Sequence, residues 1–272
     1  AEDPRKPQDP YPRVKELRDV MRKEGVSEDV PIVMAGGVWY LREWNDWIDN
    51  PELGKIAFQF GTRPLLTQES PIPQVWKDML RTVEKGDVLL HKFSPTGFYS
   101  SAVKTPFLYD LMHRSERQIP FHKRGEMDGT VQLGDEGKAR SFWVSPEDKR
   151  KAETWMREGH TEPLKTPDNT IVFVTPDKRD EIRKDQQDCM GCLSHCQFSS
   201  WKDHDDYTTG RLADPRSFCI QKTLQEIAHG EDPQDNLAFA GHSAYRFKTD
   251  PFYSNGYTPT VGELVERILT GD

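Results

Sequence analysis

The amino-acid sequence predicts a mixed α/β fold in which two parallel strands come first and an α+β region follows. Three observations support this prediction. Helix and strand patterns alternate over residues 11–67, a less regular mixture follows over residues 71–187, and four cysteines come after residue 187. Regular alternation of helix and strand is typical of a parallel sheet. We expect three zones, at residues 1–70, 71–187 and 188–272.

The first zone contains a helix pattern followed by a strand pattern, twice. Apolar residues recur with helical spacing over residues 14–21, and an apolar run follows over 30–35. An aromatic-rich helical pattern over 39–48 is followed by a second apolar run over 55–60. Parallel strands are normally buried within larger sheets, so two strands do not make a finished domain. A further polypeptide segment or chain is therefore expected to complete the sheet.

The middle zone reads as an α+β accessory region. Residues 131–144 suggest a β-ribbon, and residues 170–174 form an apolar run typical of a buried strand. Two helices are expected to begin at Ser145-Pro146 and at Thr175-Pro176, because Ser and Thr are good N-caps and Pro suits the first helical position.

The last zone is expected to hold two helices. The first should be opened by Asp214-Pro215 and carry Cys219. The final helix should begin with a capping box formed by Thr260 and Glu263, because a Thr three residues before a Glu satisfies two N-terminal backbone N–H groups.

Glycine turns follow both predicted strands of the first zone. Gly36 and Gly37 come after one strand, and Gly61 and Thr62 come after the next. The carboxyl ends of parallel strands lie at one edge, so both turns should lie together, where backbone N–H groups and the start of a following helix favour a phosphate. Ordinary strand-end turns have the same composition, and the pattern leaves both interpretations open.

Three segments, 31–38 (PIVMAGGV), 58–63 (FQFGTR) and 65–70 (LLTQES), resemble the nitronate monooxygenase family, formerly called 2-nitropropane dioxygenases. The resemblance implies the C-terminal portion of an FMN-binding TIM (β/α)8 barrel, with residues 1–70 as its last two strand–helix units. It also implies six cofactor-binding residues: Gly36, Gly37, Gln59, Gly61, Thr62 and Arg63.

Two departures from the family pattern matter. The family's first six strands, and the loop that carries its catalytic histidine, have no counterpart here, so no catalytic residue is assigned. Residues 71–272 extend well beyond the last barrel motif. We therefore expect a flavoprotein part that is completed by another segment or chain.

The cysteines Cys189, Cys192 and Cys196 follow a C-x2-C-x3-C pattern, and Cys219 comes later. Three thiolates within eight residues, with a fourth near a helix start, suit a 4Fe-4S cluster. The pattern resembles the cluster motif of iron-sulfur flavoenzymes such as 2,4-dienoyl-CoA reductase, although the last interval is longer here.

Other interpretations of these cysteines stay open. Structural zinc also accepts four thiolates, but its usual second C-x2-C pair is missing. For zinc, His195 or His204 could replace Cys219. Disulfides or unlinked thiols are the remaining alternatives.

Composition limits the classes of partner. Lys and Arg number 37 against 45 Asp and Glu, a net charge of -8, and no run of basic residues occurs, which argues against nucleic acid and anionic membranes. No apolar stretch is long enough to span a bilayer and no signal peptide is evident, so a cytoplasmic location is expected.

The function expected from the resemblance is an FMN-dependent oxidoreductase that oxidises a small-molecule substrate, a nitronate or nitroalkane, with dioxygen. A cysteine-bound cluster would favour an iron-sulfur flavin reductase or dehydrogenase, because such a cluster carries single electrons. A non-catalytic, zinc-stabilised accessory subunit is the alternative outside the enzymes.

Overall fold

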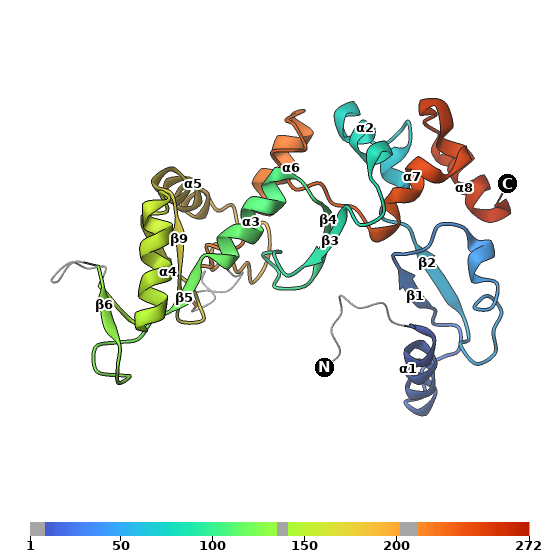
Figure 1. Ribbon diagram of the computed structural model, residues 1–272. Coiled ribbons are helices and arrows are strands. Elements are labelled where there is room, and N and C mark those ends of the chain that lie inside the picture. Colours follow the sequence, from blue (N-terminus) through green and yellow to red (C-terminus); the bar gives the residue numbers. More distant parts are fainter. Residues whose placement is uncertain (1–8, 135–140, 202–210, 272) are drawn as a thin grey trace. The chain divides into compact units, whose positions relative to one another are not determined.

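The computed structural model describes residues 9–134, 141–201 and 211–271 and divides the chain into two compact units (Figure 1). The first unit extends to His91, includes Ser101–Lys104 and resumes at Leu237. The second holds Lys92–Ser100 and Thr105–Asn236. The last part of the expected third zone thus belongs to the same unit as the N-terminal zone.

The first unit contains the predicted parallel strand pair. Helix α1 (Tyr11–Lys23) precedes β1 (Ile32–Ala35), and β2 (Ile56–Gln59) pairs with β1 in parallel. The helix packs on this sheet through a small core of Val14, Ile32 and Leu53. The predicted helix, both strands and their parallel pairing are therefore confirmed.

The helix expected between these strands is shorter than its pattern suggested. The structure has a single 3-10 turn, η1 (Leu41–Trp44), because Trp39 and Tyr40 before it are buried and Tyr40 is extended, with a φ of -126°. Burial of large aromatic side chains overrides helical spacing here. A second 3-10 turn, η2 (Arg63–Leu66), follows β2.

The remaining elements of the first unit include a second two-stranded sheet, formed by β3 and β4. They are α2 (Gln74–Thr82), β3 (Val88–His91), β4 (Ser100–Val103), η3 (His242–Tyr245), α7 (Arg246–Thr249), η4 (Pro251–Gly256) and α8 (Val261–Thr270). The capping box of α8 is present, as predicted.

The described strands form no closed barrel. They make one three-stranded and three two-stranded sheets. The fold is mixed α/β, and the expected TIM barrel is not confirmed, because β1 and β2 have only each other as partners among the described residues.

The second unit is built on an antiparallel sheet of order β5-β9-β8, beside the predicted ribbon β6-β7. Its elements are α3 (Pro106–Glu116), β5 (Gln118–Pro120), β6 (Val131–Leu133), β7 (Phe142–Val144), α4 (Pro146–Arg157), β8 (Glu162–Lys165), β9 (Thr170–Val174), α5 (Pro176–Gln187) and α6 (Ile220–Ala228). Ser145 and Thr175 cap α4 and α5 as expected, each accepting a backbone hydrogen bond with its side chain.

Strand β9 separates two cores, because its side chains alternate between the two faces of the sheet. Ile171 and Phe173 pack with α4 and the ribbon. Val172 and Val174 pack on the other face with Ile182 of α5 and with Cys196. Cys196 belongs to the segment after α5, residues 188–201, which carries three of the cysteines and is called the cysteine loop below. The central strand therefore supports the cysteine loop directly.

Helix α6 begins later than predicted. It starts at Ile220 rather than at Asp214-Pro215, and Cys219 is its N-cap residue. Asp214 instead accepts hydrogen bonds from the backbone and guanidinium of Arg216, which hold a separate turn. This local pairing competes with helix initiation.

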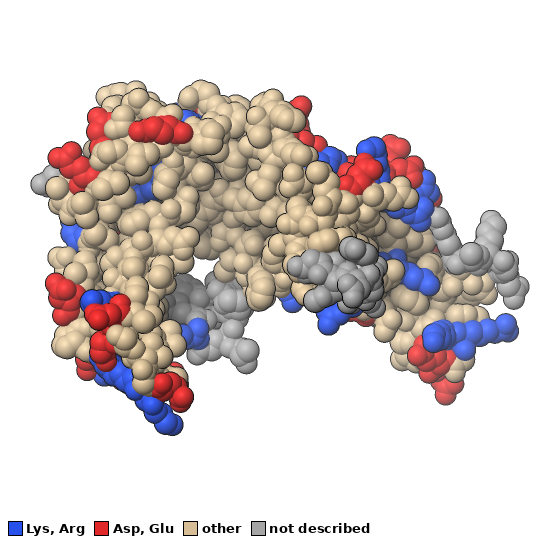
Figure 2. All heavy atoms as spheres, turned by 180° about the vertical axis from the view of Figure 1, so that it is seen from behind, with Lys and Arg blue, Asp and Glu red and all other residues tan. Residues whose placement is uncertain are grey.

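The described residues include no helix that is long and apolar enough to cross a membrane. On the face shown in Figure 2, acidic and basic side chains are interspersed.

Candidate functional site

The two glycine turns lie at the same edge of the parallel sheet. Ala35 is paired with Gln59 at the carboxyl ends of β1 and β2. The turns continue directly from this pair, and the backbone N–H of Gly36 donates to the carbonyl of Gln59 over 3.5 Å. The strand register therefore brings Gly36-Gly37 and Gly61-Thr62 side by side.

The backbone of these turns is open to an approaching group. Gly36 and Gly37 have φ values of 86° and 74°, which favour glycine, and a Cβ added at either position, or at Gly61, would meet no atom within 4 Å. Within the described part of the chain, the backbone N–H groups of Gly37, Gly61 and Thr62 make no hydrogen bond. Three free donors at one edge suit an anion such as phosphate.

The other expected cofactor residues differ in placement. Gln59 is exposed at the end of β2. The hydroxyl of Thr62 accepts a hydrogen bond from the backbone N–H of Gly241 over 2.8 Å. Arg63 is only 1% exposed and its guanidinium stacks on aromatic rings, so it points into the core of the unit.

The helices expected to strengthen the anion site are reduced to 3-10 turns. Both η1 and η2 have four residues. A short turn has a small dipole, so anion binding at this edge depends on the backbone N–H groups.

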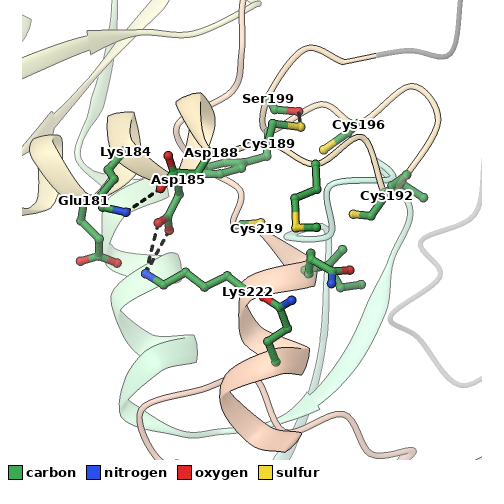
Figure 3. A pocket seen from close by; sticks show the side chains of 16 residues that line it. Glu181, Lys184, Asp185, Asp188, Cys189, Cys192, Cys196, Ser199, Cys219 and Lys222 are labelled. Carbon is green, nitrogen blue, oxygen red and sulfur yellow. Dashed lines mark hydrogen bonds and ion pairs between the residues drawn. The ribbon is translucent and has the colours of Figure 1, made fainter. Parts of the chain in front are cut away.

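All four cysteines line one cavity of about 380 Å³ in the second unit (Figure 3). The cavity lies between α5, the cysteine loop and the start of α6. Apolar residues including Met190, Leu193 and Ile220 complete its wall. The structure thus brings Cys219 together with the three cysteines of the C-x2-C-x3-C segment, although 22 residues separate it from Cys196.

The four cysteines have different environments, and all are free thiols. Cys192 is exposed and Cys196 is buried. Cys189 and Cys219 are half-buried, and the thiol of Cys189 donates to the hydroxyl of Ser199 over 3.1 Å. Four thiols lining one cavity are the type of donor that a thiolate-bound metal centre uses.

Although Cys192 is exposed, partial desolvation at the cavity wall raises the pKa of its thiol, and the neighbouring Cys219, Cys196 and Cys189 add to this rise. Burial also raises the pKa of Cys219; the backbone N–H groups of Lys222 and Gln221 at the start of α6 oppose that rise, and Asp185 adds to it. These two thiols are protonated at neutral pH without a metal, and a metal would have to displace their protons.

Gly191 fixes the shape of the cysteine loop. Its φ is 66°, and a Cβ at this position would lie 2.7 Å from the ring of Trp201. Trp201 also forms an isolated antiparallel bridge with Cys196. The tryptophan therefore closes over the loop, and only glycine leaves it enough room.

The sequence analysis missed an ion pair at the cavity. Lys222 lies 3.2 Å from the carboxylate of Asp185, and both residues also line a second cavity of about 630 Å³ in the same unit. Lys222 follows Cys219 by three residues, so it lies one helical turn further along α6. The three-residue spacing between Cys219 and Lys222 on a predicted helix could have identified Lys222 as a neighbour of the cysteine site.

Of the two histidines considered as zinc ligands, His195 does not line the cavity and has a φ of 56° within the loop. His204 lies outside the described residues. Among the described residues, no group of three or more His, Cys, Asp or Glu side chains is arranged so that it could hold a metal ion.

No protein-family model matches the chain, and no curated protein matches its sequence. Among solved structures, it is similar to the enoyl reductase domain of MlnA from the macrolactin biosynthesis cluster of Bacillus amyloliquefaciens, with a TM-score of 0.48 and 12% sequence identity. The match covers 98% of this chain and 54% of that one, so the chain spans about half the length of that structure.

Proposed function

We propose that the chain is part of an FMN-dependent oxidoreductase and that its two glycine turns hold the phosphate of the flavin. One observation carries this proposal: the register of β1 and β2 puts free backbone N–H groups of Gly37, Gly61 and Thr62 at one sheet edge. The space beside Gly36, Gly37 and Gly61 is open, so a phosphate can approach the backbone closely. The resemblance to nitronate monooxygenases supports FMN as the group that carries this phosphate.

The residues of this edge would bind and orient the cofactor. Backbone N–H groups donate to phosphate oxygens without a change in protonation, so binding here is not tied to the titration of a side chain. Gln59 offers an exposed amide beside the turns. When bound, FMN supplies hydride and single-electron chemistry, and the protein determines substrate access and orientation.

Oxidation of a nitronate or nitroalkane with dioxygen is the reaction that the resemblance supports. The resemblance assigns no catalytic base in this chain, and the substrate side of the flavin is expected on the polypeptide that completes the sheet.

The sheet itself supports such a further polypeptide. Within the described residues, β1 has a strand neighbour on one side only. Val33 on this strand is 54% exposed, although parallel strands are normally covered on both faces. An added strand and its helix would cover this side chain and pair the free edge.

For the cysteine cavity we propose a 4Fe-4S cluster. Structural zinc also accepts four thiolates, but its usual second C-x2-C pair is missing from this sequence. Three closely spaced cysteines and one distant cysteine, Cys219, all line one cavity, as a cluster with four thiolate ligands requires.

The cavity also favours a second candidate function. A cluster bound by four thiolates carries single electrons, which suits an iron-sulfur flavin reductase or dehydrogenase better than an oxygen-dependent enzyme. Nitronate-dependent oxygen consumption by the native protein separates the two. Fast consumption supports the monooxygenase, and its absence, together with reduction of an artificial electron acceptor, supports the reductase.

The proposal is tested on native protein purified without oxygen, by measuring flavin and iron per chain. We expect FMN and about four iron atoms. Cys192→Ser should lose the iron and keep most of the flavin, because the cysteine cavity and the glycine turns belong to different units. Zinc without iron and without flavin would contradict the proposal and support an accessory subunit.

A further inference from the structure

The C-terminal part of the first unit is bonded to the second glycine turn. The backbone N–H of Gly241 reaches the hydroxyl of Thr62 in the second turn. A Cβ at Gly241 would lie 3.1 Å from that hydroxyl, so the backbone of Gly241 is in close contact with the Thr62 side chain. Residues that are distant in sequence thus hold the second turn.

Arg63 connects the second turn to the first. Its Nη1 donates to the carbonyl of Trp39, which lies two residues after Gly37, and its Nε donates to the hydroxyl of Tyr253 over 3.2 Å. The guanidinium carbon lies 4.7 Å from the ring centre of Trp39 and 4.9 Å from that of Tyr40. One side chain that directly follows the second turn therefore contacts both the residues just after the first turn and the C-terminal segment.

Asp250 completes this arrangement. Its carboxylate accepts hydrogen bonds from the indole of Trp39, over 2.7 Å, and from the hydroxyl of Tyr40. Burial opposes the ionisation of Asp250, yet these two hydrogen bonds lower its pKa below the ordinary value, with a smaller contribution from Arg63. A carboxylate from the C-terminal segment thus holds the two aromatic residues on which Arg63 stacks.

This buried charge is costly, which suggests a role beyond packing. Arg63 is 1% exposed, and its Nη2 has no hydrogen-bond partner in the described part of the chain. A buried guanidinium with an unsatisfied N–H stabilises a fold less than an apolar side chain of the same volume would. A planar fork that bonds the backbone of Trp39 and the side chain of Tyr253 does, however, hold these two segments in a fixed position.

We propose that Arg63 is a positioning residue that fixes the spacing of the two glycine turns, and that through it residues 237–257 determine the selectivity of this edge for a phosphate-bearing flavin. The inference rests on the proposed FMN function. In this proposal Arg63 affects phosphate binding indirectly, by holding the backbone at Trp39 and at the second glycine turn. The sequence analysis expected its side chain to contact the cofactor directly, but that side chain is buried in the core of the unit.

The test compares FMN with riboflavin, which lacks only the phosphate, in native protein freed of cofactor. Arg63→Lys keeps the positive charge but loses the planar fork. We expect the affinity for FMN to fall about tenfold while that for riboflavin stays unchanged. Tyr253→Phe removes the acceptor of one Arg63 hydrogen bond and keeps the aromatic ring. We expect a smaller loss of the preference for FMN over riboflavin. This variant tests the proposal even if Arg63→Lys folds poorly.

Arg18→Lys is the matched control. Arg18 of α1 is also 1% exposed in the first unit, but it donates to the carbonyls of Leu53, Val30 and Lys55. It should leave the ratio of FMN to riboflavin affinity unchanged. The inference is overturned if Arg63→Lys keeps the wild-type ratio, or if Arg18→Lys changes it equally. Wild-type protein that binds both flavins equally would overturn the phosphate site itself.

Discussion

Replacing Gly191 by alanine should disrupt the cysteine cavity without removing any thiol. The new Cβ would lie 2.7 Å from two ring atoms of Trp201 and 3.2 Å from a third. These atoms belong to a rigid indole that is bridged through its backbone to Cys196. Relief of the clash therefore has to move either the tryptophan or the loop between Cys189 and Cys192.

Two contributions add to the cost. A positive φ of 66° costs an L-residue about 1–2 kcal/mol, and forcing a methyl group into occupied space costs about 1–3 kcal/mol. Gly125→Ala isolates the first contribution, because Gly125 has a φ of 75° but open space around its Cβ position. The difference between the two variants measures the contact with Trp201.

Urea unfolding followed by tryptophan fluorescence and iron content after anaerobic purification are the two assays. We expect Gly191→Ala to be less stable than Gly125→Ala by about 1–3 kcal/mol, and to lose most of its iron. Trp201→Ala in the same chain should recover part of that stability difference, as coupled neighbours do. Equal stability and equal iron in the two glycine variants would refute the role of this contact.

Two further predictions concern stability. Partial burial opposes ionisation of Asp168, but hydrogen bonds from Thr166 and Arg216 lower its pKa to about 2, so the carboxylate stabilises the fold above pH 4 and this contribution disappears as the pH falls through 2. Asp168→Asn should therefore lower the unfolding midpoint at pH 7, with a difference from wild type that narrows below pH 4; a constant difference would contradict the pairing. Thr260→Ala should destabilise α8 by about 1 kcal/mol, because it removes the acceptor for the backbone N–H of Glu263. Thr260→Ser should behave as wild type, and equal losses in both variants in denaturant unfolding would argue against the capping role.

Local chemistry accounts for the elements that the sequence predicted well. Ser145, Thr175 and Thr260 each cap a helix. The side-chain oxygen of each accepts a hydrogen bond from the backbone N–H three residues later in the chain, and this bond needs no distant partner. The parallel pairing of β1 with β2 was also predictable, since alternation of helix-like and strand-like patterns constrains topology.

Local sequence patterns predicted helices wrongly where residues distant in the chain bind the segment. The helical pattern of residues 39–48 gave only a 3-10 turn, because Trp39 and Tyr40 bond Asp250 from the C-terminal segment. The start of α6 moved to Ile220, because Arg216, which the distant Asp168 and Gln118 also bind, pairs with Asp214. Nothing in the spacing of these residues identifies such partners in advance.

The sequence alone determined which residue types the two candidate sites contain: glycine turns after strands, and four cysteines in a recognisable spacing. Tertiary structure decided how they are used. It turned Arg63 inward to connect the two turns, and it brought Cys219 to the cavity of the other three cysteines. The physical reason is that backbone turns and caps depend on neighbours in the chain, whereas the burial of a charge or the gathering of four thiols depends on contacts between distant segments.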